Sequence, residues 1–423
     1  MKMRGHDRVA IVMSLSLGIA ETLPAQAPVP IRELSAPTAS TTDHFGAVLG
    51  IRPLSDGRVL VDDGRSRQLV ILDRNLSNRV VLLDSLATVQ GGLSYGTRAS
   101  PLIPFLKDTI LFADWSSLAL NVISPSGELV RTMAAPKPSD VRAITRSQGG
   151  SDVHGNLVYI VAPLPSRLNG WTNPDSEVVV RASFDTRTVD TVGRVARFEA
   201  DHIKKELINA DSVDIRYRNP VKTIDEWAVL SDGTVAFVRG HDYHVDVIRP
   251  DGTKISGAKL PFDWKRLTDA DKQALIDSAR TVRETNEHDP NATPNLVSIS
   301  AVIGAEQGGA RPTNANQPKI YVREVSTGEI ADFWPPIRRG AARADLDNNL
   351  WILPTTSAQA KNGELIYDVV NNKGEMKERV RIPDGRAIAG FGRNGVVYLM
   401  HREGNSGWII ERTTIIEKTR QLN

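Results

Sequence analysis

The sequence predicts an all-β protein, a six-bladed β-propeller, from three observations. A strand-turn-strand unit recurs along the chain, its clear copies follow one another at intervals of about 46 to 51 residues, and its strands are apolar almost throughout. A four-stranded propeller blade takes roughly 40 to 50 residues. Strands that are apolar on both faces are expected where both faces are covered, as they are between neighbouring blades.

The clearest copy of the unit covers residues 54–73. Asp56-Gly57 supplies the positive φ angles of a tight hairpin turn, and two segments rich in Val, Leu and Ile follow it. The same order returns around Asp232-Gly233. Weaker copies begin at the turns around Asp108, Gly155, Asn349 and Gly395, so six units are recognised.

Two intervals are longer than one blade, those from residue 155 to 233 and from 233 to 349. The second contains a predicted helix over residues 268–284, with Thr268 as its N-cap. Leu275, Ile276, Ala279 and Val282 form its predicted apolar face. Residues 319–325 and 329–333 resemble a strand pair, which leaves seven blades as an alternative. We therefore expect one propeller domain over residues 28–423, with an insertion at about 263–337.

The first 27 residues have the pattern of a secretory signal peptide. Lys2, Arg4 and Arg8 precede an apolar run over residues 9–20, and Ala25-Gln26-Ala27 forms a small-x-small cleavage site. The mature protein is therefore expected in the periplasm or outside the cell. At the other end, the last unit lacks a fourth strand. Residues 31–42 are predicted to supply it, which would tie the two chain ends together.

The composition argues against several functional classes. The formal net charge is +2, which gives no electrostatic case for nucleic acid or acidic membranes as partners. Outside the signal peptide no stretch is apolar enough to span a membrane. The chain has no cysteine, so a full-sized core has to stabilise it without disulfides. We expect a soluble monomer.

The repeat unit resembles the NHL-type repeat, in which an apolar strand ending in Asp is followed by a polar loop with Arg and a second apolar strand. The segments 59–67 and 69–73 match that pattern best. The whole chain is similar to exported bacterial six-bladed propeller proteins of unassigned function, which carry the equivalents of Pro335-Pro336-Ile337, Asn349-Leu350-Trp351 and a terminal Gly-Val-Val-Tyr unit. The resemblance implies a fold, and it implies no specific activity.

The resemblance also implies a ligand-binding face, where the loops between the second and third strands of the blades converge. On this face we expect a mixture of basic, acidic and aromatic side chains that suits a polar or acidic ligand. These candidates are Asp62, Asp63, Arg65, Arg67, Asp114, Trp115, Arg239, His241, Asp242, Tyr243, His244, His401, Arg402 and Glu403.

A metal site and an enzyme are the alternatives. His241 and His244 flank Asp242, and His154 or His401 would have to supply a third protein ligand for zinc. Propellers similar to lactonases and lyases hold a divalent metal near the axis, but no full ligand set is recognised here.

We therefore expect a binding module for a small polar ligand or a protein partner, with the 268–284 helix bordering the loop face. A metal-dependent lactonase-like hydrolase or lyase is the alternative. No catalytic residue and no cofactor is predicted, and a divalent metal is left open. The Asp residues at strand ends are expected to bond backbone amides in turns. Trp351 and Tyr398 are expected to pack between blades.

Overall fold

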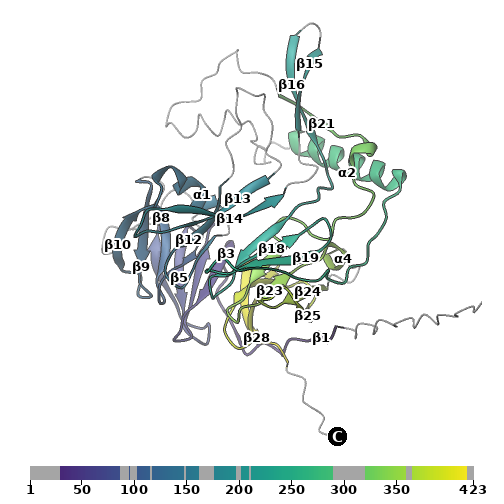
Figure 1. Ribbon diagram of the computed structural model, residues 1–423. Coiled ribbons are helices and arrows are strands. Elements are labelled where there is room, and N and C mark those ends of the chain that lie inside the picture. Colours follow the sequence, from purple (N-terminus) through teal and green to yellow (C-terminus); the bar gives the residue numbers. More distant parts are fainter. Residues whose placement is uncertain are drawn as a thin grey trace, which may run out of the picture.

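A computed structural model shows a six-bladed β-propeller, as the repeats predict (Figure 1). The structure describes residues 29–85, 95, 102–114, 117–146, 149–161, 176–196, 202–208, 211–288, 320–358 and 364–416. The predicted signal peptide and Trp115 lie outside these residues. No helix in the described part of the chain is long and apolar enough to cross a membrane.

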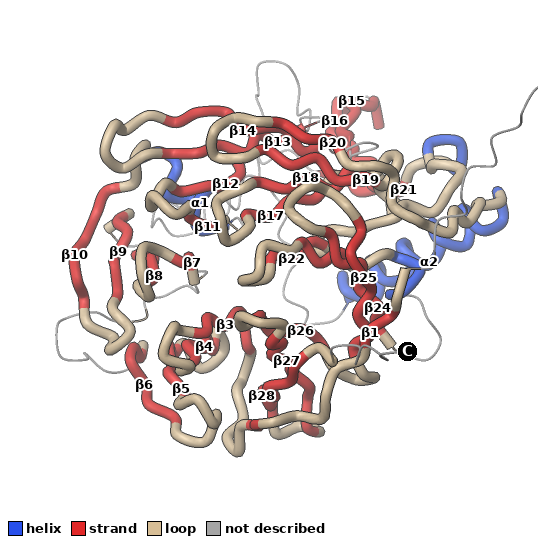
Figure 2. The backbone as a smooth tube through the Cα atoms, turned by 60° about the horizontal axis from the view of Figure 1, so that its bottom comes forward, coloured by secondary structure: helices blue, strands red, loops and turns tan. Residues whose placement is uncertain are grey.

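Each blade is an antiparallel sheet whose first strand lies at the centre of the ring. Figure 2 shows the six first strands β3, β7, β11, β17, β22 and β26 around the middle of the molecule. Blade I contains β3 (Val48–Pro53), β4 (Val59–Asp63), β5 (Gln68–Leu72) and β6 (Arg79–Asp84). Blade II contains β7 (Ile103–Pro104), β8 (Ile110–Asp114), β9 (Ala119–Ile123) and β10 (Leu129–Ala134).

The remaining blades follow in chain order. Blade III contains β11 (Gly150–Ser151), β12 (Leu157–Val161), β13 (Ser176–Ala182) and β14 (Val189–Ala196). Blade IV contains β17 (Glu226–Val229), β18 (Val235–Arg239), β19 (His244–Ile248) and β20 (Lys254–Ser256). Blade V contains β22 (Ala342–Ala344), β23 (Leu350–Ile352), β24 (Leu365–Val370) and β25 (Met376–Ile382). Blade VI contains β26 (Ala387–Phe391), β27 (Val396–Glu403) and β28 (Gly407–Thr414).

The core consists of an apolar layer at each junction between neighbouring blades. Along β4, Leu60 packs in the layer shared with blade II, while Val59 and Val61 pack in the layer shared with blade VI. Successive side chains of a strand point to opposite faces, so one apolar strand serves two junctions. Trp351 lies between blades V and VI and Tyr398 between blades VI and I, which confirms the prediction for both.

The N-terminal segment closes the ring. β2 (Ala39–Ser40) pairs antiparallel with β28 and becomes the outermost strand of blade VI, as predicted from residues 31–42. β1 (Ile31–Arg32) pairs parallel with β25 at the outer edge of blade V. The closure joins strands from both ends of the chain and covers the edge that blade VI would otherwise expose.

A seventh sheet stands outside the ring and is not a blade. It has the order β15 (His202–Ile208), β16 (Asp211–Arg218) and β21 (Ile320–Glu324), with β16 and β21 parallel. The predicted strand pair of 319–325 with 329–333 is therefore wrong. β21 pairs with a strand from the other long interval, and Thr327–Glu329 forms a short 3-10 helix, η3. In Figure 1 the β15–β16 hairpin projects from one end of the propeller.

Helix α2 (Asp269–His288) packs beside this extra sheet. Thr268 caps it as predicted, because the Asp271 backbone N–H donates to Thr268 Oγ1 at 3.2 Å. Ile276 lies in an apolar cluster with Leu267 and Trp334. Val282 is exposed, so its predicted place on the apolar face of the helix is wrong. At this point α2 meets β21 through the neighbouring Arg283, which donates a hydrogen bond to Glu324. The shorter helices are η1 (Pro138–Asp140), α1 (Val141–Arg146) and α4 (Thr355–Ala358).

Candidate functional site

The two ends of the propeller differ in what they carry. Antiparallel strands alternate in direction, so the loops between second and third strands share one end with the connections between blades. The β15–β16 hairpin and α2 belong to such connections, and Figure 1 shows both at that end. We call it the loop face. The helix therefore lies at the face that the sequence predicted it to border.

The opposite end carries the turns between third and fourth strands and those between first and second strands. These turns bond to one another from blade to blade: Ser231 Oγ donates to Asn348 Oδ1 at 2.6 Å, and the Gly395 N–H donates to Asp347 Oδ2 at 2.8 Å. His154 belongs to a turn at this end, where its N–H donates to Asp152. It therefore lies at the other end of the propeller from His241, and the two do not form a common site.

Among the candidates of blade I, Asp63 stabilises the backbone of the loop face. Asp63 is buried and accepts hydrogen bonds from the backbone N–H groups of Gly46 and Ala47 at 3.0 and 2.9 Å, and from Ser66 Oγ at 2.7 Å. It thus fixes the connection between β2 and β3, as expected for an Asp at a strand end. Arg65 is exposed and Arg67 is half-buried.

Asp62 is the most unusual titratable group among the candidates. It is 1% exposed, accepts a hydrogen bond from the Tyr95 hydroxyl through Oδ1, and has no partner for Oδ2 among the described residues. Burial raises the pKa of this carboxyl to about 7. The hydrogen bond from Tyr95 acts to lower the pKa, and the negative charge of Asp63 acts to raise it.

Blades II and VI contribute less to a common site. Asp114 ends β8, and its side chain lies outside the described part of the structure. His401 Nδ1 lies 3.8 Å from Glu411 Oε2, and Glu403 pairs with His44 at 2.7 Å. Arg402 is exposed. These side chains stand on blade VI, two blades away from His241 and His244 (Figure 2).

Tyr243 is not exposed on the loop face, contrary to its prediction as a ligand-binding residue. Its side chain is fully buried between blades IV and V, and its hydroxyl donates to Asp368 Oδ2 at 2.7 Å. Burial raises the pKa of Tyr243, and the negative charge of Asp368 raises it further. Its backbone has a φ of 51°, in the left-handed region.

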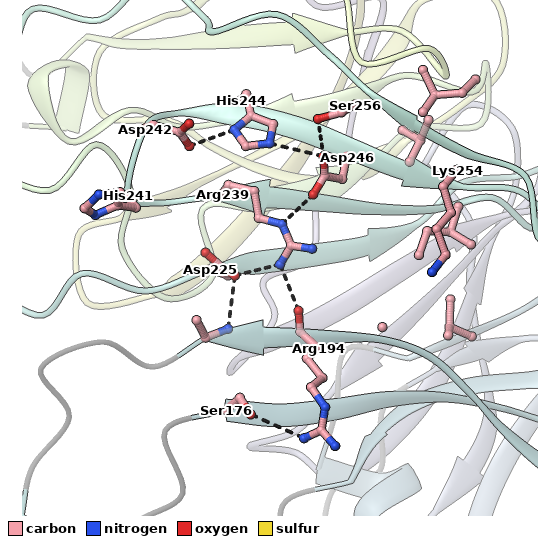
Figure 3. Close-up of a pocket in the computed structure, with 16 residues that line it drawn as sticks. Ser176, Arg194, Asp225, Arg239, His241, Asp242, His244, Asp246, Lys254 and Ser256 are labelled. Carbon is pink, nitrogen blue, oxygen red and sulfur yellow. Dashed lines mark hydrogen bonds and ion pairs between the residues drawn. The ribbon is translucent and has the colours of Figure 1, made fainter.

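Among the predicted residues, the structure brings together Arg239, His241, Asp242 and His244. They line a cleft between blades III and IV with a volume of about 770 Å³. Its walls are the outer strand β14 on one side and β19 and β20 on the other, so it opens at the outer side of the ring and not on the axis. Figure 3 shows the polar side chains at its loop-face end.

A network of charges holds these side chains in place. Arg239 donates to Asp225 Oδ2 and to Asp246 Oδ2, both at 2.7 Å. The two ring nitrogens of His244 lie 2.7 Å from Asp242 Oδ1 and 3.1 Å from Asp246 Oδ1. Figure 3 shows this chain of contacts running from Asp225 to Asp242.

The network also sets the ionisation of its members. Burial alone would raise the pKa of Asp246, but hydrogen bonds from Ser256 and Arg239 and the charges of Arg239 and His244 lower it below its usual value. Burial would lower the pKa of Arg239, yet its bonds to Asp246 and Asp225 raise it. Both groups are therefore charged at neutral pH.

Four charged residues of the cleft are not among the residues predicted from the sequence: Arg194, Asp225, Asp246 and Lys254. For Asp246 a signal was present, because His244, Asp246 and Ile248 alternate along one strand and must share a face. Arg194 and Asp225 come from the neighbouring blade and from the connection to it, so no local pattern links them to His244.

Within the described residues, no group of three His, Asp or Glu side chains is placed to hold a metal ion. The carboxylates around His244 are bonded to Arg239, to Ser256 and to the imidazole itself. The predicted pair of His241 and His244 therefore receives no third ligand from the described part of the chain.

No family model and no curated protein matches the chain. Solved structures with a similar fold include a virginiamycin B lyase from Staphylococcus aureus, at 10% identity and a TM-score of 0.38 over 89% of this chain and 97% of that one. A DUF4221 member from Bacteroides vulgatus has 10% identity and a TM-score of 0.41, over 91% and 98%. Regucalcin from Agrobacterium tumefaciens has 12% identity and a TM-score of 0.37, over 91% and 96%. These values carry no argument about function.

Proposed function

We propose that this protein is a binding module for a small ligand, which it holds in the cleft between blades III and IV. The observation that supports the proposal is a cleft of about 770 Å³ with polar side chains at its loop-face end and apolar ones below. Sites for small molecules are typically concavities of roughly 300 to 1,000 Å³, mostly apolar, with a few well-placed polar groups.

The fixed geometry of the polar end supports binding as well. Arg239 and His244 are each held by two carboxylates, so a ligand would not have to order them. Side chains that are already immobile lower the entropic cost of association. The metal-dependent hydrolase or lyase has no comparable support, because the described residues provide no cluster of three metal ligands.

The proposal is tested by filling the cleft. Val192 on β14 lines it, whereas Thr191 on the same strand is exposed and does not. A soluble fragment library is screened by thermal shift against the wild type, Val192→Trp and Thr191→Trp. We expect compounds that raise the melting temperature of the wild type and of Thr191→Trp, and that leave Val192→Trp unchanged.

Two outcomes would overturn the proposal. Fragments that stabilise all three proteins equally would place the ligand site elsewhere, and a library without any stabilising compound would argue against a small-molecule site. Thr191→Trp controls for the general effect of an added indole on β14. Circular dichroism of both variants shows whether the propeller still folds.

A further inference from the structure

His244 faces a carboxylate with each of its two ring nitrogens (Figure 3). Nδ1 lies 2.7 Å from Asp242 Oδ1, and Nε2 lies 3.1 Å from Asp246 Oδ1. A neutral imidazole has one N–H donor and one lone pair, whereas an imidazolium donates from both nitrogens. Only the protonated ring can therefore donate a hydrogen bond to both carboxylates in this arrangement.

The two carboxylates differ in how firmly they are held. Asp246 stands on β19 and also accepts hydrogen bonds from Arg239 at 2.7 Å and from Ser256 at 2.6 Å. Asp242 stands in the β18–β19 loop, and its other charged neighbour among the described residues is the exposed Lys259, with Nζ at 4.0 Å. An exposed pair contributes little to stability. When the imidazole loses its proton, Asp242 is therefore the carboxylate that can turn into water.

The β18–β19 loop forms the loop-face end of the cleft. Its two ends are fixed without the imidazole, because the Gly240 N–H is hydrogen-bonded and the Tyr243 side chain is fully buried. His241 and Asp242 at the centre of the loop line the cleft. The contact between Asp242 and His244 ties this centre to β19.

The other charged groups around the imidazole come from neighbouring strands and connections: Asp225, Arg239, Lys254 and Lys259. Burial acts to raise the pKa of Asp246, but hydrogen bonds from Ser256 and Arg239 lower it below its usual value. An ordinary carboxyl group titrates at about pH 4, and lysine and arginine titrate above about pH 10. Histidine is therefore the residue type of this region whose charge changes near neutral pH.

We infer that protonation of His244 regulates the cleft by fixing the centre of the β18–β19 loop. With the ring protonated, Asp242 is bound and the loop-face end of the cleft is preformed. With the ring neutral, Asp242 turns into water and this end of the cleft loosens, so that a ligand has to order the loop itself. This inference rests on the proposed binding function and names how acidity regulates the same cleft.

A spin label in the loop tests the inference. The chain has no cysteine, so one introduced cysteine carries a nitroxide at a chosen site. His241→Cys places the label beside Asp242 and removes the second histidine of the loop. Leu118→Cys places it at an exposed position before β9 in blade II, as the control. Electron paramagnetic resonance spectra at pH 5.5 and pH 8, on either side of the usual titration of histidine, report the mobility of each label.

We expect the label at residue 241 to move more freely at the higher pH, and the label at residue 118 to move equally at both. The change should disappear in His244→Gln, whose side chain is uncharged throughout. It should also disappear in Asp242→Asn, because an amide accepts from a protonated ring and donates to a neutral one. A label at residue 241 whose mobility does not depend on pH would overturn the inference, and so would a change that persists in His244→Gln.

A second measurement separates this inference from the proposed function. Fragments without ionisable groups that stabilise the wild type and not Val192→Trp are titrated into the wild type and His244→Gln at both pH values. We expect the wild type to bind them about threefold or more weakly at the higher pH, because ordering side chains costs affinity, and His244→Gln to bind them equally.

The outcomes of the titration have distinct meanings. Equal affinities of the wild type at both pH values would leave the cleft as the binding site and would overturn its regulation by His244. A library without any fragment that binds in the cleft would overturn the proposed function. The spin-label measurement needs no ligand, so it decides the role of His244 in the loop in either case.

Discussion

At the scale of single residues, three buried tyrosines each donate a hydrogen bond to a buried aspartic acid side chain. Tyr159 donates to Asp140 at 2.9 Å and Tyr243 to Asp368 at 2.7 Å, and Tyr95 donates to Asp62. Burial raises the pKa of each tyrosine, so the hydroxyls stay protonated and act as donors at any physiological pH. Each bond gives one oxygen of a buried carboxyl group a hydrogen-bond partner, which lowers the cost of burying that group.

Asp62 makes the stability of the protein depend on pH. Its pKa is about 7 in the folded chain and about 3.9 in an unfolded one. Between these values the folded protein retains a proton that the unfolded chain has released, so the free energy of unfolding falls as pH rises towards 7 and levels off above it.

We expect Asp62→Asn to remove this decline. Between pH 5.5 and pH 8 the wild type should lose on the order of 2 kcal/mol more than the variant. Urea unfolding of both proteins at the two pH values measures the difference. Parallel declines in the wild type and the variant would show that Asp62 does not carry a raised pKa.

At the scale of elements, the sequence predicts those hairpins and helices that begin at a recognisable turn or cap. The first hairpins of blades I, IV and VI follow Asp-Gly or Asn-Gly turns, and helix α2 follows its Thr268 cap. Each of these elements lies within a few residues of its signal. The parallel pair of β16 and β21 has no turn of its own, and the two strands lie more than a hundred residues apart. The cleft could not be predicted either, because its residues come from different blades, for example Arg194 from blade III and Lys254 from blade IV, and no local pattern links them.

Helix α2 depends on a buried charge for its position. Lys272 has a side chain that is 5% exposed, and its Nζ lies 2.7 Å from Asp332 Oδ1. Removal of the acid by Asp332→Ala would leave the ammonium buried without that partner, which favours release of the helix. We expect hydrogen exchange of the α2 amides to accelerate at least about tenfold in Asp332→Ala, while exchange in the blades stays the same.

A second variant separates the charge effect from a loss of packing. Lys272→Met/Asp332→Ala removes the ammonium as well and should restore slow exchange in α2. Asp277→Ala, which breaks an exposed pair with Arg280 on the same helix, should change little. Fast exchange in the double variant would mean that Asp332 acts in some other way than by pairing with Lys272.

For the whole molecule, closure of the ring decides whether the blades act as one unit. Each blade shares an apolar layer with both neighbours. The layer between blades VI and I joins strands from the two ends of the chain, and β2 on β28 holds those ends together. Loss of that pairing would expose the layer and leave two blades with one neighbour each, so it should affect every blade.

Thr41 is the residue with which this closure can be tested. It is 5% exposed, and its Oγ1 accepts a hydrogen bond from the Ile410 N–H at 3.1 Å. Thr41→Val keeps the shape of the side chain but leaves a buried N–H without its acceptor, which costs about 1 to 3 kcal/mol. Thr38, at the exposed edge of the same segment, bonds to the Arg412 carbonyl, and Thr38→Val should change stability by less than about 0.5 kcal/mol.

Urea unfolding followed by circular dichroism and by tryptophan fluorescence measures both variants. In Thr41→Val the two signals should shift together, because strands of all six blades and the buried Trp227 and Trp351 of the III–IV and V–VI layers lose their packing in one transition. Separate transitions would show that the ring opens between blades VI and I while the other blades remain folded. An equal loss of stability in Thr38→Val would show that any change in the outer strand of blade VI has this effect.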